Sequence, residues 1–444
     1  MPTSRTSRET YSHVTRRMRW SRIATFFAFF QMGAVMLMWS TSTTSLRNHL
    51  GWEGDGGDVS FGSLATAVGI GYAIGCAISG PMIDRWGCRN VAIPTLVIYP
   101  LLYLPLTLIG PMAGLIVTGV LIGLMRGFVD IVANVNGVQV ERYYERPIMS
   151  AFHAAYPAGG FIFGFIGSAL ARGFTDSPLV PYLAIGIPLS ILGYFFGRLY
   201  LSNEEYLKVA ETTPVTAKCE TPASSTATRI GLFLVIGLGV LAFVSYLAES
   251  AANDWGQEYV VRSLNTTAGT GAMALTVFSG AQFAGRAMGD RLTKRLGQRT
   301  VMAGSGVIGT IGAGLMLTAS VPAQALIGFG FLGLGISCII PLMLSAAGRT
   351  DPENAGRNIG LVNAIGTTGM FVGPALITTV VSGLGIGWMP VLPLVLLAAI
   401  AIAGPLLMRK APTFVRQSSE GAVPEAVDLT DMKHEENLAA IPRS

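Results

Sequence analysis

GPMIDRWGCRN, residues 80–90, is a short charged segment between two long apolar segments. A second segment of the same kind, GDRLTKRLGQR, occupies residues 289–299. Their aspartates, Asp84 and Asp290, lie 206 residues apart, close to half of the 444-residue chain. A soluble enzyme has no obvious need for such a repeat, whereas a membrane transporter built from two related halves does.

The composition is that of a membrane protein. The chain is 51% hydrophobic and 12% charged, has a mean hydropathy of +0.54, and contains 55 Gly. A soluble core cannot enclose that much apolar surface, and glycine is frequent where transmembrane helices pack closely. The net charge of +5 does not indicate nucleic acid as a partner, because the Lys and Arg residues are not gathered into one patch.

No cofactor, metal site or catalytic site is expected from the motifs. The four cysteines, Cys76, Cys88, Cys219 and Cys338, have no CxxC or metal-ligand spacing. The nucleotide motif G-x-x-x-x-G-K-[ST] does not occur, which argues against direct coupling to ATP. Because no nucleophile–base pair stands at chemical spacing either, we predict that the chain is not an enzyme.

Twelve apolar segments of about 18–25 residues are each long enough to cross a bilayer. We predict these spans at residues 23–46, 59–80, 91–110, 113–140, 149–171, 181–200, 229–250, 268–289, 300–320, 323–347, 358–382 and 388–408. If the N-terminus is cytoplasmic, 26 of the 30 Lys and Arg fall on the cytoplasmic side. Arg47, Arg172 and Arg262 fall outside, and Arg126 lies within a span. This asymmetry predicts that both termini are cytoplasmic.

The predicted fold class is an all-α integral membrane protein with two pseudo-symmetric six-helix halves. Five regions are expected along the chain, a basic N-terminal tail, a six-helix half, a linker, a second six-helix half and a polar tail, at residues 1–22, 23–200, 201–228, 229–408 and 409–444. The linker and the C-terminal tail have the polar composition of disordered segments, and we assign them no function.

This arrangement resembles the major facilitator superfamily, in which a G-x-x-x-D-R-x-G-x-R segment connects the second and third helices. Residues 130–153, ESAANDW at 249–255 and PLMLSAAGRT at 341–350 resemble its fucose-permease-like bacterial branch. The resemblance implies a solute permease, in several cases proton-coupled. One departure is that the sugar–proton symporter of this branch has an acidic residue near the outer end of its first helix. Residues 39–50 contain no carboxylate, and Arg47 stands about there.

The fourth span carries the most polar residues. Arg126, Asp130 and Asn134 are four residues apart, so they share one helix face, and Arg126 can pair directly with Asp130. A charge at mid-bilayer costs about 2.5–3.5 kcal/mol on insertion scales, so it is kept only when paired or facing a wet cavity. Two interpretations stay open: a structural ion pair, or a cavity-lining pair whose Asp130 exchanges a proton. The resemblance implicates an acidic residue at this position in proton coupling.

Two further candidates for proton coupling are Glu249 and His153. Glu249 is expected about one turn inside the outer end of its span, as a gate, as a second protonation site or as a side chain that reaches external water. His153, about one turn inside the cytoplasmic end, either packs in the core or titrates near neutral pH. The polar and aromatic candidates for lining a solute cavity are Gln31, Trp39, Ser42, Asn134, Tyr246, Asn253, Gln282, Asn363 and Thr367. The alternative interpretation is that the polar ones among them form hydrogen bonds to the backbone of their own helix.

The duplicated charged segments are candidates for a gating motif. Its residues are Gly80, Asp84, Arg85, Gly87, Arg89, Asp290, Arg291, Arg295 and Arg299. The resemblance implies that Asp84 meets the start of the eleventh helix, and that Arg85 and Arg89 lie near Glu141 or Glu145. Such contacts would hold the outward-facing state. The alternative is that these charges only set the topology.

Together these features predict a secondary active transporter in the cytoplasmic membrane that acts as a monomer. Its partners are the lipid bilayer, protons and a small polar organic solute, with sugars among the candidates, and the expected mode is proton symport by alternating access. One alternative is proton-antiport efflux of drugs or metabolites. An alternative of another class is a membrane sensor that does not transport and whose linker or tail binds a partner.

Overall fold

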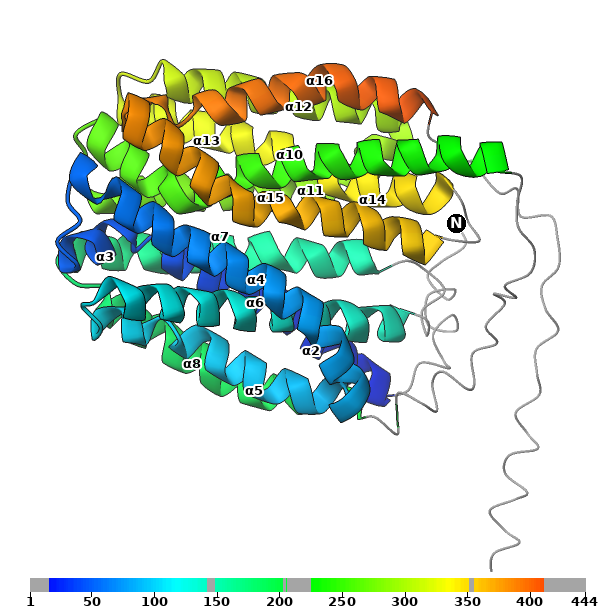
Figure 1. Cartoon of the computed structure of the whole chain (residues 1–444), viewed down its shortest axis with the longest axis horizontal. Helices are drawn as coiled ribbons and strands as arrows, with labels where there is room; N and C mark the ends of the chain where they lie inside the picture. Colours follow the sequence, from blue (N-terminus) through cyan, green and yellow to red (C-terminus); the bar gives the residue numbers. More distant parts are fainter. Residues whose placement is uncertain (1–15, 142–147, 203–204, 206–224, 351–354, 411–444) are drawn as a thin grey trace, which may run out of the picture. The chain divides into compact units, whose positions relative to one another are not determined.

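The computed structural model describes residues 16–141, 148–202, 205, 225–350 and 355–410 (Figure 1). Regular structure in these residues consists of helices only. The first half of the chain forms α2 (Arg16–Ser40), α3 (Thr43–His49), η1 (Asp55–Gly57), α4 (Asp58–Trp86), α5 (Cys88–Leu101), η2 (Leu104–Thr107), α6 (Met112–Glu141), α7 (Met149–Gly173) and α8 (Leu179–Gly197). The second half forms α10 (Ser225–Ser263), α11 (Ala268–Leu296), α12 (Gln298–Leu317), α13 (Pro322–Ile336), α14 (Ile339–Thr350), α15 (Ala355–Leu384), η4 (Ile386–Trp388) and α16 (Val391–Lys410).

Eleven helical stretches in the described part of the chain are long and apolar enough to cross a membrane. The predicted eighth span, residues 268–289, is also a helix, α11, but it is too polar to be counted among them. α11 packs against α7, α10 and α13, and its Gln282 is buried inside the bundle. The polarity of α11 therefore reflects its position inside the bundle, and α11 is the predicted eighth helix.

The two charged repeats form the same backbone turn. Gly87 separates α4 from α5 with φ 81° and ψ 150°, and Gly297 separates α11 from α12 with φ 80° and ψ 152°. This region of φ and ψ is open essentially to glycine alone, which explains why both repeats carry glycine there. The duplication seen in the sequence is thus a duplication of local structure. The side of the bundle that holds Gly87 and Gly297 is called the Gly87 end below.

The opposite side of the bundle, called the Arg47 end, holds Arg47 and the C-terminal end of α10. The predicted seventh span ends at residue 250, whereas α10 continues to Ser263. That predicted boundary is wrong. The added helical turns carry polar side chains, but Asp254, Gln257 and Glu258 are all buried against residues of the first half. Buried hydrogen bonds and ion pairs therefore replace the apolar contacts expected of a membrane helix.

Glycines bring α4 and α6 close together beside the centre of the bundle. A Cβ atom at Gly123 would overlap the Val68 carbonyl, and one at Gly71 would overlap the Val120 carbonyl. Such close packing is typical of helices inside a membrane. It holds the next turns of the two helices in contact, where Tyr72 of α4 meets Asp130 of α6.

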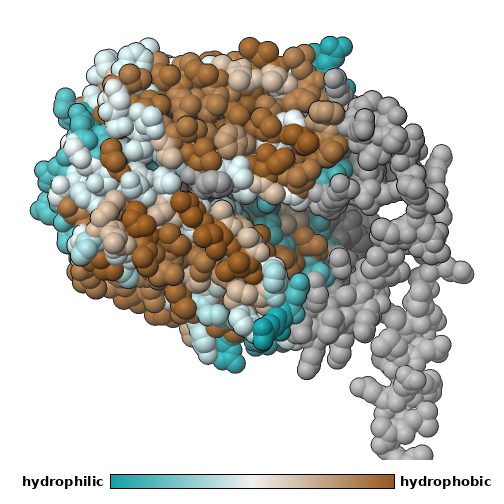
Figure 2. All heavy atoms as spheres, viewed as in Figure 1, coloured by the Kyte–Doolittle hydropathy of each residue, from teal (hydrophilic) through white to brown (hydrophobic). Residues whose placement is uncertain are grey.

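The outer faces of the helices are apolar. Figure 2 shows hydrophobic residues along the sides of the bundle and hydrophilic residues at its Arg47 end, on the left. Large exposed side chains on these faces include Ile162, Phe195 and Ile402. A soluble protein rarely exposes so much continuous apolar surface, so this surface is suited to lipid.

The contacts between the two halves of the chain are made mainly by two helix pairs. α7 packs on α11, and α4 packs on α15. The α7–α11 pair includes a hydrogen bond between the hydroxyl groups of Ser168 and Thr276 at 3.1 Å. α2 and α10 also meet between these pairs, which brings polar residues of both halves to the centre.

Candidate functional site

A small pocket lies between the two halves of the chain. Its walls come from α2, α4 and α6 on one side and from α10 and α15 on the other, with Met36, Tyr72, Arg126, Asn253, Asp254 and Met370 among the lining residues. Its volume of about 20 Å³ has room for about one water molecule. A larger solute therefore needs a wider state of this pocket than the one seen here.

Asp130 is held beside this pocket by two neutral donors. The Tyr72 hydroxyl donates to Asp130 Oδ2 at 2.5 Å, and Asn134 Nδ2 donates to Asp130 Oδ1 at 2.8 Å. The Arg126 guanidinium lies over the Tyr72 ring, 5.3 Å from its centre. Among the described side chains, Arg126 and Asp130 do not form the direct ion pair that their spacing predicted. Tyr72, which the sequence did not single out, stands between them.

The second half of the chain contributes two buried carboxylates on α10. Glu249 accepts a hydrogen bond from Gln282 Nε2 of α11 at 3.0 Å. Asp254 accepts from Ser250 Oγ at 2.8 Å and, across the halves, from Trp39 Nε1 at 3.3 Å. The predicted position of Glu249 near the outer end is wrong: it lies 14 residues before the end of α10, or about 21 Å along the helix. With 4% of its surface exposed, it does not reach external water.

Several of the cavity candidates have other partners. Gln31 is fully buried and donates from Nε2 to the carbonyls of Leu96 at 2.8 Å and Leu189 at 3.1 Å, so it ties α2 to α5 and α8. Thr367 donates to Ala364 of its own helix at 3.2 Å. Ser42 is buried just before α3. For Gln31 and Thr367 the prediction of a cavity-lining side chain is not supported, because packing direction cannot be read from residue type. For Ser42 it stays a prediction.

Other candidates lie nearer the pocket. Asn253 lines it, and Trp39 contacts its Asp254. Tyr246 and Asn363 are half-buried in α10 and α15. The His153 ring packs on Phe29 with 4.6 Å between ring centres, in line with the packing interpretation.

A helix contact between the halves lies beside His153. Arg286 Nη1 of α11 donates to the His153 carbonyl of α7 at 3.2 Å. The backbone of His153 therefore takes part in an inter-half contact, while its ring packs within the first half.

A network of five charged residues closes the Arg47 end, and it is called the Arg47 network: Arg47, Asp55, Asp58, Glu258 and Arg262. Arg47 pairs with Asp58 at 2.7 Å and with Glu258 at 3.2 Å. Arg262 pairs with Asp58 at 2.6 Å and also contacts Asp55. The side chains of Arg47, Asp58 and Glu258 are 1%, 0% and 4% exposed. Residues from both halves are thus joined by buried ion pairs.

Neutral hydrogen bonds extend this closure. Thr43 Oγ1 donates to Gln257 Oε1 at 2.7 Å, and Gln257 Nε2 donates to the Thr41 carbonyl at 2.8 Å. Thr44 Oγ1 donates to Glu258 at 2.6 Å. In the sequence, Arg47 and Arg262 are two of the few basic residues predicted on the outer side. Their acidic neighbours, at positions 55, 58 and 258, were the signal that a buried network was present.

The Gly87 end lacks such contacts among the described residues. Asp84 is exposed and has no partner there. Glu141 accepts from the backbone N–H groups of Ile148 and Met149 at 2.6 and 2.7 Å, at the start of α7. The predicted contact of Arg85 or Arg89 with Glu141 is therefore not formed here.

The remaining gating candidates are exposed or lie outside the described residues. Arg85, Arg291, Arg295 and Arg299 are exposed, and the Arg85 guanidinium lies 6.0 Å from the Trp86 ring centre. Glu145 and the side chain of Asp290 lie outside the described residues. No contact between Asp84 and the start of α15, the eleventh predicted helix, is found among the described residues.

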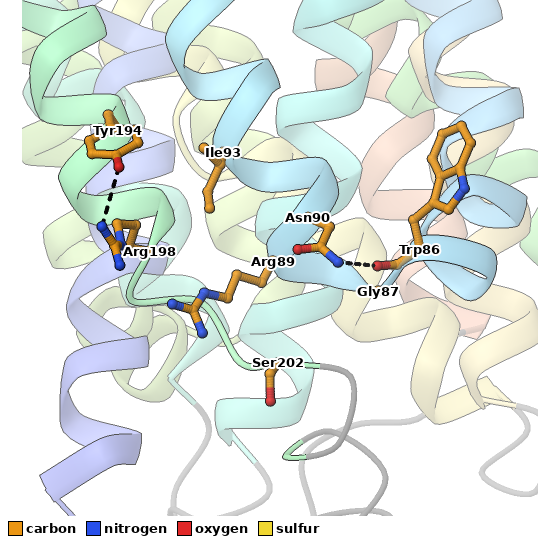
Figure 3. A pocket seen from close by; sticks show the side chains of 8 residues that line it. All are labelled: Trp86, Gly87, Arg89, Asn90, Ile93, Tyr194, Arg198 and Ser202. Atoms are coloured by element: carbon orange, nitrogen blue, oxygen red, sulfur yellow. Dashed lines mark hydrogen bonds between the residues drawn. The ribbon is translucent and has the colours of Figure 1, made fainter.

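Arg89 lines a hollow of about 390 Å³ at the Gly87 end (Figure 3). The hollow is formed by the first half alone, from α4, α5 and the end of α8. Arg198 donates to the Tyr194 hydroxyl at 3.2 Å, and Asn90 Nδ2 donates to the Trp86 carbonyl at 2.9 Å. The hollow is therefore separate from the pocket between the halves.

Comparison with known proteins identifies the architecture. A solved D-xylose–proton symporter superposes with a TM-score of 0.68 at 13% identity, covering 88% of this chain and 98% of that one. The chain has the major facilitator fold. The solved nucleoside transporter NupG superposes with a TM-score of 0.64 at 14% identity, covering 90% of this chain and all of that one. At these identities the likeness shows the fold alone.

Sequence comparisons find similarity to proteins of the same superfamily. The Major Facilitator Superfamily model matches residues 238–436. An uncharacterized MFS-type transporter of Yersinia pestis is 27% identical over 357 residues, which are 80% of this chain and 88% of that protein. The chain is thus a multi-pass membrane protein with this fold. In the structure, its Arg47 end is closed by buried charges, and its central pocket is contracted.

Proposed function

We propose that this transporter moves a small polar organic solute across the cytoplasmic membrane by proton-coupled symport, with the two halves giving alternating access to the central pocket. The observation that carries the proposal is Asp130, an ionisable group beside a pocket whose walls come from both halves. Intramembrane ionisable residues are typically kept for ion or substrate pathways. A place between two moving halves lets one carboxyl group face each side of the membrane in turn.

Asp130 is suited to carry the proton. While ionised, it accepts hydrogen bonds from Tyr72 and Asn134 at 2.5 and 2.8 Å, which compensates its buried charge. Protonation removes that charge and lowers the cost of moving the group through the membrane interior. One proton that enters down the membrane potential supplies about 2.3 kcal/mol per 100 mV, enough to concentrate a neutral solute tens-fold.

The orientation belongs to the same proposal. Arg85, Arg89, Arg291, Arg295 and Arg299 all lie at the Gly87 end, so this end is assigned to the cytoplasm by the excess of basic residues there. The Arg47 end is then the outer side, and both described ends of the chain face inward. The protein acts as a monomer, because each monomer holds a complete pocket between its own halves.

Sugars are the first solutes to test. The chain superposes on a D-xylose–proton symporter, and residues 130–153 carry the resemblance to the fucose-permease-like branch. The pocket offers Ser250 and Asn253, which are suited to hydroxyl groups. Proton-antiport efflux is the outcome that the same experiment would favour if added solutes drive proton movement in the opposite direction.

The test uses purified protein in liposomes that contain a pH-sensitive dye. Sugars, sugar acids and amino acids are added outside one at a time, to wild type, to Asp130→Asn and to Asp176→Asn, whose carboxylate is exposed between α7 and α8. We expect one solute class to acidify the lumen with wild type and Asp176→Asn, and not with Asp130→Asn. Solute exchange without a proton gradient should persist in Asp130→Asn.

Two results would contradict the proposal. Acidification that persists in Asp130→Asn would remove Asp130 from the proton path. Silence across the panel, in liposomes whose protein orientation and dye response have been verified, would exclude symport of these solute classes.

A further inference from the structure

The Arg126 guanidinium is a buried cation that no described side chain pairs with directly. Its side chain lines the pocket between the halves, and only 9% of the residue is exposed. Within the described part of the chain, it makes no ion pair and no hydrogen bond. The face of the Tyr72 ring lies 5.3 Å away, and the carboxylates of Asp130 and Asp254 interact with it only through longer-range electrostatics. A guanidinium has five N–H donors in a fixed plane, and it stays charged at any physiological pH.

The carboxylates near Arg126 already have neutral donors. Asp130, one helical turn along α6, is held by Tyr72 and Asn134. Asp254, on the opposite wall of the pocket, is held by Ser250 and Trp39. Arg126 is therefore the pocket residue with unused donors and a full charge. An unpaired cation buried in a membrane protein is costly, so a partner is expected at another stage of the transport cycle.

A solute carboxylate supplies that partner. The planar guanidinium matches a carboxylate group through two parallel N–H···O bonds, which a neutral sugar does not offer. We propose that Arg126 binds the carboxylate of the transported solute, and that the solute is a small hydroxylated carboxylic acid such as a sugar acid. The proposal rests on the transport function proposed above, and it names the substrate class of that same pocket.

The opposite wall of the pocket fits the rest of such a molecule. Asn253 is 3% exposed and, among the described residues, has no side-chain hydrogen bond recorded, so its amide is available to hydroxyl groups. Met370 on this wall, and Met36 on the wall that holds Arg126, give adaptable apolar contacts for the carbon chain. The pocket widens to admit the solute, and closure around it brings Arg126 and Asn253 onto its two ends.

The charge of the transported species provides a sharp readout. A monocarboxylate that enters with one proton on Asp130 carries no net charge, whereas a neutral sugar with one proton carries one positive charge. Uptake of the acid is therefore indifferent to the membrane potential. Uptake of a neutral sugar would accelerate when the lumen is made negative.

The experiment compares matched pairs in proteoliposomes: glucose with gluconate, and galactose with galactonate. Binding is measured in detergent by thermal stabilisation, and uptake is measured with and without a potassium diffusion potential. We expect the acids alone to bind and to enter with wild type, at rates that the potential does not change. Arg126→Gln should weaken acid binding about 10–100-fold, the range for loss of a charge-assisted hydrogen bond. Arg198→Gln, an exposed arginine outside the pocket, should leave binding unchanged.

The possible outcomes test the carboxylate assignment of Arg126 and the symport proposal separately. If neutral sugars are transported with protons, and Arg126→Gln binds them normally, the carboxylate assignment is overturned while proton symport stands. If the acids bind through Arg126 but move no protons, the assignment stands and the symport proposal fails. If no acid stabilises the wild type, the assignment is overturned. Should Arg126→Gln fail to fold, Arg126→Lys keeps the charge without the planar fork, and wild-type affinity in that variant would contradict bidentate binding.

Discussion

The two ends of the bundle differ in the contacts that join the two halves of the chain. At the Arg47 end, the Arg47 network and the hydrogen bonds of Gln257 join the two halves through buried side chains. At the Gly87 end, four arginines of the repeated charged segments are exposed, namely Arg85, Arg291, Arg295 and Arg299. Asp84 has no described partner there. The repeat gives both halves the same turn, at Gly87 and Gly297, but it does not by itself join them.

This difference indicates which end of the bundle contributes more to the stability of the observed conformation. Removing one member of a buried ion pair strongly destabilises a protein. Exposed charges contribute little to its stability. The state seen here is therefore held at its Arg47 end. The alternating access proposed above would exchange these contacts for others, and the exposed charges of the Gly87 end are available to make them.

The largest effect is expected from Arg47→Met. This change keeps much of the side-chain volume but leaves Asp58 and Glu258 with less compensating charge in a buried site. The expected loss is about 3–5 kcal/mol in the free energy of unfolding. Denaturant titration of the detergent-solubilised protein measures it, with the exposed Arg198→Met as a control that should stay within about 0.5 kcal/mol. Wild-type stability in Arg47→Met would mean that the Arg47 network does not hold this state.

A medium effect is expected at the repeated turns. Gly87→Ala and Gly297→Ala each place a side chain at a φ near 80°, which costs on the order of 1–3 kcal/mol. The two losses should be alike, because the two turns have the same backbone geometry. Gly304→Ala, in open space on α12, is the control and should be neutral or slightly stabilising. A loss at one turn only would break the equivalence of the repeats.

A smaller effect is expected from Glu205→Gln at the Gly87 end. The hydrogen bond and charge of Arg17 lower the pKa of Glu205 to about 2. The stabilisation is therefore complete above the ordinary pKa of about 4.5 and is lost as the pH falls toward 2. An exposed pair contributes about 0.2–1 kcal/mol. Melting curves at pH 7 and pH 3 should show a difference between variant and wild type that narrows at pH 3, and a widening difference would contradict the assignment.

The smallest effect on stability is expected from Asp84→Asn. Because Asp84 is exposed and unpartnered among the described residues, the change should stay within about 0.5 kcal/mol. The same denaturant titration measures it. A loss above 1 kcal/mol would show that Asp84 stabilises this state, and would make the two ends more alike than they appear here.

The sequence predicts the fold through features that are local. Long apolar segments and the repeated turn glycines depend on neighbouring residues only, so the helical bundle and the turns at Gly87 and Gly297 are confirmed. The polar face of α6 is likewise periodic, and Arg126 does line the pocket. The sequence failed where partners come from distant segments. Gln31 has the residue type of a cavity-lining side chain, but its position turns it toward α5 and α8.

The extent of α10 could not be predicted for the same reason. Residues 251–263 are too polar to resemble a membrane helix when taken alone. They are helical because Asp254, Gln257 and Glu258 find donors on the first half of the chain, more than 200 residues away. Periodicity in a sequence indicates that a helix has a polar face, but it does not indicate which residues of another helix that face contacts.

α10 is one continuous helix that contributes residues both to the pocket and to the Arg47 network. Asp254 lines the pocket, and Arg262 stands eight residues further on, about 12 Å along the same helix. Because both residues belong to one helix, a tilt of α10 that widens the pocket at Asp254 also moves Arg262. In the alternating-access cycle proposed above, solute selectivity would therefore be linked to how often the Arg47 end opens, because a substitution that repositions Asp254 would also shift Arg262.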